Sequence, residues 1–464
     1  MLGPDEPRYA SIGREMARSG DWITPRLWGE PWFEKPALLY WITGAAFRLG
    51  LGDDLAPRLP VALLSVAFLI FFQCILSHEF GARAAWTAML ILGTSAAWLG
   101  CSYIGTTDLP MAAAFSTAML LSLDWIETGA RRRLPLAAAL LGVAVLAKGL
   151  TPLVLTLPLV WCGRRRWRDL LRLPVVGAFL VVALPWYLLC YARNGADFPR
   201  TFFWEQHFER FVSASLAHGQ PFWFYVPVLA VALMPWTPAL VLLARRALYC
   251  DARRRFLLLW LVFGLVFFSM SKNKLPGYLL PLMPAAAVLV GIAIEESQRV
   301  RWVLPAAALC LIAIPAALPV LPEALAAGLS RAPLPAFQWP WLLPVALALG
   351  IYGLEQRGSR AAALAALAVA VTTGVVALKL VDLPAIDRAY SARPLWREIA
   401  GRHDRLCVEN IHRSWRYGLN YYSVTPLPDC SQSPRPLRVW QEPGHPPSLR
   451  APLVPAPLVP APSS

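Results

Sequence analysis

VALLSVAFLIFFQCIL, residues 61–76, decides the fold, because it holds no charged residue over nearly the length that a helix needs to cross a bilayer. Comparable windows occur at 111–123 and 257–270. The chain of 464 residues is 57% hydrophobic and only 15% charged, and a water-soluble core of this length could not use so much apolar surface. The sequence therefore predicts an all-α polytopic membrane protein and disfavours a large helical bundle in water.

We expect twelve membrane-spanning segments, each near the roughly 20 residues that span the hydrocarbon core. They are 56–77, 84–101, 110–128, 134–148, 150–163, 173–191, 222–244, 256–271, 275–294, 302–321, 339–355 and 361–381. The fourth and fifth are short and are separated only by Gly149 near Pro152. These two form either a tight hairpin or a single bent element.

The orientation follows from the basic residues of the loops. If the segments alternate sides, one set of loops carries most of the arginines: Arg83, Arg131, Arg132, Arg133, Arg164, Arg165, Arg166, Arg168, Arg172, Arg245, Arg246, Arg253, Arg254, Arg255, Arg299, Arg301, Arg357 and Arg360. Cytoplasmic loops carry the excess of Lys and Arg. The N-terminal segment, the loop at 192–221 and the C-terminal segment are therefore predicted to face outward, with the chain in a bacterial inner membrane.

Three regions are expected: a first external loop at 1–55, a transmembrane helical domain at 56–381 and a small mixed α/β domain at 382–464. In the first, Asp5 before Pro7 and the later Gly20 are helix start and stop signals, and a second, surface-lying helix is expected over 36–49. In the last, we predict a helix near 394–401, strands in RLCVEN (405–410) and LNYYSV (419–424), and an extended Pro-rich tail from Pro426.

The N-terminal 55 residues contain no apolar signal segment and several basic residues, so their export without a preceding span is difficult. We therefore expect one further span upstream of Met1. An in-frame stop directly before Met1 in the genomic DNA, with no apolar segment, would contradict this.

The chemistry-bearing residues gather on the predicted outer side. Charges inside the spans are few and lie near their ends, as Asp124 and Glu127 do near a cytoplasmic end. An ion-coupled transporter needs ionisable groups or broken helices near the membrane midplane, whereas an enzyme acting on lipids needs its groups at the head-group level. The distribution favours an enzyme over a lipid or glycan transporter.

Three motifs carry a family resemblance: D-E-x-R-Y-A at 5–10, F-E-K-P at 33–36 and K-L-P-x-Y-x-L-P at 274–281. Together they resemble the bacterial aminoarabinose transferases that modify lipid A, which belong to the GT-C class alongside the protein O-mannosyltransferases. The resemblance covers roughly residues 5–290 and departs from the family pattern at Pro7 and Ser11. It implies thirteen spans, a large first external loop, and transfer of a sugar such as 4-amino-4-deoxy-L-arabinose from undecaprenyl phosphate to lipid A or another envelope acceptor.

The motifs place two candidate catalytic carboxylates at Asp5 and Asp108, each of which would otherwise be a plain helix N-cap. The candidate substrate-binding residues are Glu6, Arg8, Tyr9, Glu34, Lys35, Lys148, His207, Arg210, Lys272, Lys274 and Tyr278. The lysines would grip a lipid phosphate, or else snorkel to the interface. Glu6 is expected to brace the loop by pairing with Arg8, since neighbouring residues point in different directions.

The remaining expectations concern cofactors, cysteines and the acceptor. No metal site is predicted, because His207 lacks a second His at ligand spacing, and a divalent metal stays an alternative. Cys407 and Cys430 form a disulfide if their compartment is oxidising, or else stay free thiols. The acceptor alternatives within the same fold are a protein hydroxyl and a polysaccharide.

Overall fold

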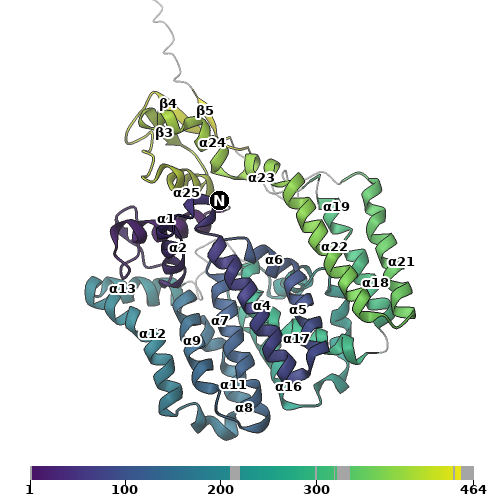
Figure 1. The fold of residues 1–464 in the computed structure, drawn as a ribbon. Helices are drawn as coiled ribbons and strands as arrows, with labels where there is room; N and C mark the ends of the chain where they lie inside the picture. Colours follow the sequence, from purple (N-terminus) through teal and green to yellow (C-terminus); the bar gives the residue numbers. More distant parts are fainter. Residues whose placement is uncertain are drawn as a thin grey trace, which may run out of the picture.

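Helices dominate the computed structural model, which describes residues 3–209, 220–297, 300–317, 319–320, 335–442 and 445–450 (Figure 1). Each of the twelve predicted apolar segments contains helix. Because a lipid environment offers no hydrogen-bond partners, a chain this apolar must satisfy its backbone internally, and helices do so within each segment. The fold class is as predicted.

The helices of the apolar region alternate with short 3-10 turns. The α-helices are α4 (Leu59–Phe80), α5 (Ala82–Thr94), α6 (Ala96–Ser102), α7 (Asp108–Leu121), α8 (Leu123–Thr128), α9 (Leu134–Lys148), α10 (Thr151–Leu155), α11 (Leu157–Cys162), α12 (Leu173–Asn194), α15 (Tyr225–Ala232), α16 (Ala252–Met270), α17 (Met283–Glu296), α18 (Val300–Cys310), α19 (Ala313–Ala317), α21 (Leu342–Gln356) and α22 (Arg360–Val381). The 3-10 helices are η1 (Arg164–Asp169), η3 (Phe222–Phe224), η4 (Thr237–Ala244), η5 (Arg246–Tyr249), η6 (Pro276–Leu282) and η8 (Trp339–Trp341).

The length and composition of these helices show which of them could cross a membrane. Within the described residues, five uninterrupted helical stretches are long and apolar enough to cross a bilayer: 59–80, 108–128, 173–194, 276–296 and 360–381. Two further segments are pairs of helices, α5–α6 bent by 63° and the pair 222–232 and 237–244 bent by 115°. The helices at 134–148, 151–162 and 301–317 are apolar but shorter. The chain is a multi-pass membrane protein in which several of the predicted spans are bent or short.

The two short segments around Gly149 form a hairpin. Gly149 has a positive φ of 81° that ends α9, and the chain returns through α10 and α11. Arg131 before α9 and Asp169 after α11 form an ion pair of 2.8 Å, so both ends of this segment lie on the same side. The alternative of one bent element is wrong.

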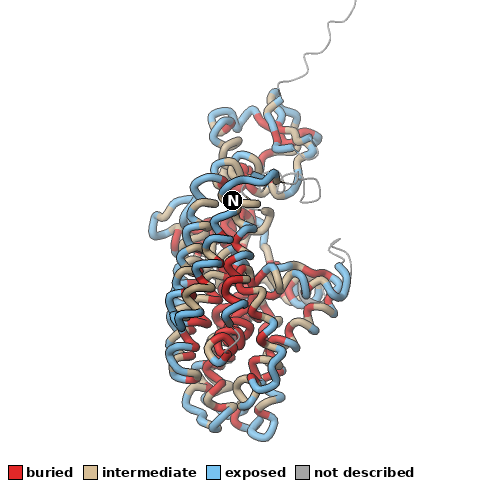
Figure 2. Tube along the Cα trace, turned by 90° about the vertical axis from the view of Figure 1, so that its right-hand side faces the viewer, coloured by how far each residue is buried: buried red, intermediate tan, exposed pale blue. Residues whose placement is uncertain are grey.

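Two helical stretches form the centre of the bundle. The stretch 108–128 is 83% buried and 276–296 is 89% buried, whereas the spanning helices α4, α12 and α22 are less than a third buried. Figure 2 shows the same arrangement, with buried segments inside and exposed ones around them. The central helices begin with Asp108 and with the motif around Tyr278, so whatever lies at these ends is enclosed by the rest of the bundle.

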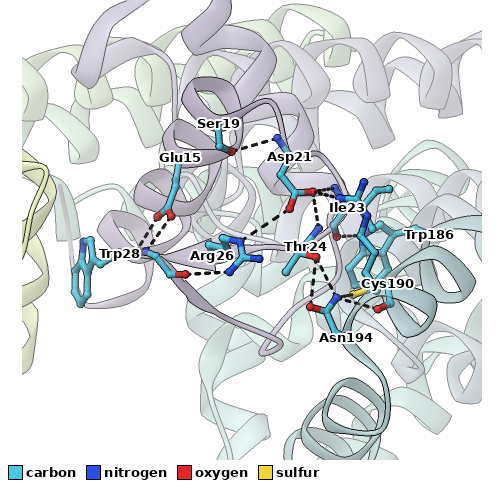
Figure 3. Close-up of polar contacts among 12 residues, drawn as sticks. Glu15, Ser19, Asp21, Ile23, Thr24, Arg26, Trp28, Trp186, Cys190 and Asn194 are labelled. Carbon is cyan, nitrogen blue, oxygen red and sulfur yellow. Dashed lines mark hydrogen bonds and ion pairs between the residues drawn. The ribbon is translucent and has the colours of Figure 1, made fainter.

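The N-terminal segment packs over that end of the bundle as α1 (Asp5–Ser19), β1 (Arg26–Leu27), β2 (Glu30–Pro31), α2 (Leu38–Arg48) and α3 (Gly52–Leu55). The predicted stop of α1 is confirmed, since Gly20 adopts the left-handed conformation. Figure 3 shows how the next loop is tied down: Asp21 accepts from the backbone of Ile23 and Thr24 and pairs with Arg193 at 2.7 Å. The segment is thereby anchored to α12.

The C-terminal segment has its own apolar core, formed among others by Trp415, Leu419 and Val439. Its elements are α23 (Leu383–Tyr390), α24 (Ala392–Ile399), η9 (Ala400–Arg405), β3 (Leu406–Glu409), α25 (Arg413–Ser423), β4 (Leu437–Trp440) and β5 (Ser448–Arg450). The sheet order is β3-β4-β5, with β3 parallel to β4 and β4 antiparallel to β5. The helix near 394–401, the strand in RLCVEN and the Cys407–Cys430 disulfide are confirmed.

Two predictions in this segment are wrong. LNYYSV is the end of helix α25 and not a strand, because His412 caps the helix by accepting from the N–H of Ser414, and both faces of α25 are packed, one on the local core and one on α1. Tertiary packing overrides the β propensity of the tyrosines and valine. The predicted extended tail from Pro426 instead contains β4 and β5, while 451–464 lies outside the described residues.

Candidate active site

One cavity of about 270 Å³ lies at the end of the bundle that the N-terminal segment covers. Four parts of the chain that are distant in sequence line it: the N-terminal segment, the start of α7, the end of α9 with the start of α10, and 267–278. Its lining residues are Asp5, Tyr9, Glu34, Lys35, Thr106, Thr107, Asp108, Met111, Lys148, Thr151, Phe267, Phe268, Ser271, Asn273, Leu275, Gly277 and Tyr278. Seven of the predicted site residues therefore meet in one place.

Asp5 is the first residue of α1, and its carboxylate is half-exposed toward the cavity. The N-cap position belongs to Pro4, and the Asp5 side chain makes no capping hydrogen bond, so its interpretation as a plain N-cap is wrong. It forms an ion pair with Arg8, one turn along the helix, whose Nη2 contacts the Asp5 carboxylate. Asp5 is thus held by a cation and directed at the cavity, and not used to start the helix.

Arg8 joins Asp5 to the F-E-K-P motif. Its Nη1 lies 3.1 Å from Oε2 of Glu34, and the other oxygen of Glu34 lies 3.6 Å from Nζ of Lys35. Burial works against the Arg8 charge, but Glu34, Tyr9 and Asp5 outweigh it and raise the pKa of the guanidinium. Arg8 therefore remains a permanent cation between two carboxylates.

Two buried tyrosines lie close to these charges. Tyr9 from α1 and Tyr40 from α2 lie with ring centroids 6.0 Å apart. Burial first, and then the negative charge of Glu34, raise the pKa of both phenols well above the ordinary value. Both hydroxyls stay protonated at neutral pH, so Tyr9 enters the cavity wall as a neutral hydrogen-bonding group.

The opposite wall carries a second carboxylate with its own cation. Asp108 is the first residue of α7, and its N-cap position belongs to Thr107, so the N-cap interpretation is wrong here too. Lys148, the last residue of α9, contacts Asp108 Oδ1 through Nζ, and the same ammonium lies 4.9 Å from the centroid of the Tyr278 ring. Gly277 lies beside this carboxylate, at a distance where a Cβ would make an ordinary contact of 3.6 Å with it.

Glu6 does not line the cavity, and its expected pairing with Arg8 is wrong. Glu6 is fully buried, and its carboxylate accepts from Arg58 through both oxygens, at 2.6 and 2.7 Å. Oε1 also accepts from the N–H of Gly105 at 3.1 Å. Glu6 therefore braces α1 against α4 and against the loop that carries Thr106, Thr107 and Asp108.

The predicted residues in and just before the K-L-P-x-Y-x-L-P motif lie in three different surroundings. Tyr278 lines the cavity. Lys272 is exposed and lies outside the lining. Lys274 is buried, and its ammonium donates to the carbonyl oxygens of Ser271 at 2.6 Å and Gln220 at 3.0 Å. In this arrangement Lys274 fixes the shape of the 271–274 turn and does not reach the cavity.

The last two predicted site residues are His207 and Arg210. The backbone of His207 lies in the π-helical stretch η2 (Arg200–Glu209), which follows the short helix α13 (Asp197–Pro199). Arg210 lies outside the described residues.

The sequence analysis missed several lining residues. Thr106, Thr107, Thr151 and Asn273 add polar groups to the wall, and Phe267 and Phe268 add an apolar side that faces the membrane helices. The two threonines directly precede Asp108, and Asn273 directly precedes the K-L-P-x-Y-x-L-P motif, so their proximity to predicted residues was a usable signal. Thr151 and the phenylalanines carry no such mark, because they look like ordinary span residues.

The arrangement pairs negative charges with cations around a partly apolar space. Asp5 and Glu34 share Arg8, while Asp108 holds Lys148. In the described part of the chain, no three His, Cys, Asp or Glu side chains gather as a metal site would require. The cations can neutralise a phosphate, and the carboxylates can face positive charge or take a proton.

Comparison with known proteins gives three findings in agreement with this geometry. Residues 34–189 match the family model of the dolichyl-phosphate-mannose-protein mannosyltransferases. An undecaprenyl phosphate-alpha-4-amino-4-deoxy-L-arabinose arabinosyl transferase of Pseudomonas aeruginosa is 35% identical over 316 residues, which are 64% of this chain and 56% of that protein. The protein of the same name from Edwardsiella ictaluri is 35% identical over 306 residues, covering 62% and 54%. The chain spans about half the length of the curated relatives it matches.

The structural likeness extends further along the chain. The crystal structure of ArnT from Cupriavidus metallidurans bound to undecaprenyl phosphate superposes with a TM-score of 0.74 at 26% identity. The likeness covers 95% of this chain and 89% of that one. The apo form of the same protein gives the same TM-score at 27% identity. Because the likeness covers 95% of this chain, it includes most of the C-terminal segment.

Proposed function

We propose that the chain belongs to the family of the bacterial lipid A aminoarabinose transferases, and that it transfers 4-amino-4-deoxy-L-arabinose, or a similar sugar, from undecaprenyl phosphate to lipid A or a related envelope acceptor. The observation that carries the proposal is the cavity in which Asp5, Lys35, Asp108 and Lys148 meet beside apolar helix ends. A lipid-linked sugar needs such a combination, since its phosphate requires cations and its chain requires an apolar approach. The curated relatives are named for an arabinosyl transfer of this kind, and the similar ArnT structure is that of a complex with undecaprenyl phosphate.

In the proposed reaction the donor phosphate lies near Lys35 and Lys148, and the anomeric carbon lies near Asp5. An acceptor oxygen attacks that carbon with inversion, the bond to the undecaprenyl phosphate oxygen breaks, and the phosphate leaves with the electron pair. The lysines stabilise the charge that grows on the phosphate, which is the kind of preorganised electrostatic term that lowers barriers most. Asp5 faces the positive charge at the anomeric carbon, or takes the proton of a hydroxyl acceptor.

The distribution of charge along the described helices disfavours a transporter. In the described helices of the apolar bundle, the charged side chains stand near helix ends, such as Asp108 and Lys148 beside the cavity and Glu79, Glu295 and Glu355 at the other end. A transporter needs such groups at mid-span. We further propose that the cavity faces the periplasm and that the arginine-rich loops at the α8 end are cytoplasmic, in accord with the positive-inside rule.

A second candidate reaction is transfer to a protein hydroxyl, because the matched family model is that of protein mannosyltransferases. Purified protein tests both candidates when it is given undecaprenyl-phosphate-linked aminoarabinose with lipid A or with a Ser/Thr-rich peptide. The proposal expects a pentosylated lipid A and no labelled peptide. Label on the peptide alone would favour the second candidate, and no label on either would refute both.

A further inference from the structure

The C-terminal segment reaches the active site through one aromatic ring. Tyr417, from the middle of α25, lies over the guanidinium of Arg8 at 5.2 Å from ring centroid to Cζ. The rings of Tyr9 and Trp32, each 5.7 Å away, are the other aromatic neighbours of that guanidinium. Arg8 is thus surrounded by aromatic rings from two distant parts of the chain.

These rings restrict the orientation of the Arg8 guanidinium where hydrogen bonds do not. Arg8 uses Nη1 and Nη2 for Glu34 and Asp5, while its buried Nε has no hydrogen-bond partner. A planar guanidinium held only at one edge can still tilt, and rings on its faces restrict that motion through cation–π and stacking contacts. The orientation of Arg8, and with it the position of Asp5, therefore depends on the aromatic residues.

Tyr417 is itself held by a strained residue. Trp28 stacks on Tyr417 with ring centroids 5.8 Å apart and an angle of 19°. Trp28 and Gly29 form the two-residue turn between β1 and β2, both with positive φ, at 56° and 90°. A bulky side chain rarely adopts this conformation, which Gly, Asn or Asp accept in such turns.

The surroundings maintain the strained turn. Glu15 from α1 accepts from the backbone N–H groups of Trp28 and Gly29, each at 2.9 Å, as Figure 3 shows. If the turn only had to connect β1 and β2, Asn or Gly at position 28 would adopt its conformation with less backbone strain. A costly side chain kept in place by the rest of the structure marks a functional requirement, and the contact it makes here is the one with Tyr417.

We propose that Tyr417, held by Trp28, is a positioning residue that fixes the Arg8 guanidinium and thereby the Asp5 carboxylate in the cavity. The C-terminal segment then contributes to catalysis and is more than an attached unit. This inference rests on the proposed function, because its readout is sugar transfer.

The experiment compares four variants of the whole protein in steady-state transfer from the undecaprenyl-phosphate-linked sugar. Tyr417→Leu removes the ring and is expected to lower kcat about 10-fold, which is the range of a desolvated cation–π contact, while the KM for the donor changes less than about 2-fold. Tyr417→Phe keeps the ring and is expected to restore kcat. Tyr422→Leu is the matched control, since Tyr422 is an α25 tyrosine that contacts Asp54 and not Arg8.

The variant Trp28→Gly tests whether Trp28 acts on the positioning of Tyr417 or only on the stability of the fold. Glycine relieves the positive φ and keeps the backbone hydrogen bonds to Glu15, but it also removes an indole that packs against the core, so kcat is measured well below the melting temperature of the variant, where it is folded. The loss of stacking should nevertheless lower kcat about 3-fold, as expected for an aromatic pair. A kcat loss in the folded variant, with an unchanged KM for the donor, is what a merely structural residue would not produce.

The outcomes are distinct. An inactive wild-type protein would refute the proposed function and this inference with it. An active wild type with normal kcat in Tyr417→Leu and Trp28→Gly, or an equal loss in Tyr422→Leu, would overturn the inference alone. Failure of Tyr417→Phe to restore kcat would also overturn it, because the ring and not the hydroxyl is proposed to act.

Discussion

Substitution of Glu6 by glutamine tests how the active-site loop is held. Oε1 of Glu6 accepts from Arg58 Nε and from the Gly105 N–H, and Oε2 accepts from Arg58 Nη2. A glutamine has the same shape but must place an NH₂ group where one of these oxygens stands. In either orientation two donors then face each other, and the Arg58 charge loses its counter-charge.

The expected cost is large because Glu6 is fully buried and Arg58 is only 20% exposed. Removal of one partner from a buried ion pair costs about 3–5 kcal/mol, and the partial exposure of Arg58 places the expectation at the lower end, about 3 kcal/mol. Thermal unfolding of the purified protein in detergent measures it. Glu30→Gln is the control, because Glu30 is an exposed carboxylate on β2, where changes are usually within about 0.5 kcal/mol.

The double variant Glu6→Leu/Arg58→Leu provides the sharper test. Replacement of both partners of a buried pair by apolar residues is often nearly neutral, so the double variant should be more stable than Glu6→Gln. If Glu6→Gln unfolds within about 0.5 kcal/mol of the wild type, as its control should, then the ion pair does not hold α1 to α4 and to the Gly105 loop, and the reasoning is refuted.

Three further predictions concern the charges of the site and the disulfide. Asp5→Asn should lower kcat about 10²–10³-fold with little change in melting temperature, because Asp5 makes no cap; near wild-type transfer would pass the catalytic role to the other cavity aspartate. Lys35→Ala should lower kcat/KM for the lipid-linked donor strongly, because an ammonium that faces the phosphate is lost, whereas Arg132→Ala in a loop at the opposite end should not; equal kinetics of both would make Lys35 an interfacial anchor only. The double variant Cys407→Ser/Cys430→Ser opens a loop with a separation of 23 residues, which is worth about 3 kcal/mol, and calorimetry should show the loss; a reducing agent that destabilised this variant as much as the wild type would contradict the assignment.

The membrane helices and the core of the site could be predicted because their signals are local. Long apolar windows predict helices whatever surrounds them, since lipid leaves the backbone no other choice. The D-E-x-R-Y-A and F-E-K-P motifs marked Asp5, Arg8, Glu34 and Lys35, which the structure brings together.

The remaining features depend on contacts that sequence spacing does not show. The partner of Glu6 is Arg58, fifty-two positions away, and not the nearby Arg8. Lys274 stands in a matched motif but uses its ammonium for backbone carbonyls. Tyr417 lies 409 positions from Arg8 (417 − 8), close to a segment whose tyrosines favour a strand. In each case a tertiary contact decides the role, and local pattern could not have revealed it.

The measurement that tests the central claim most directly is mass spectrometry of lipid A. It compares cells that lack their own aminoarabinose transferase and express the protein, its Asp5→Asn variant, or neither. The account predicts a mass increase of one aminopentose per modified phosphate with the wild type, and none with the other two. An unchanged lipid A with a correctly inserted wild-type protein and an available donor would contradict the account.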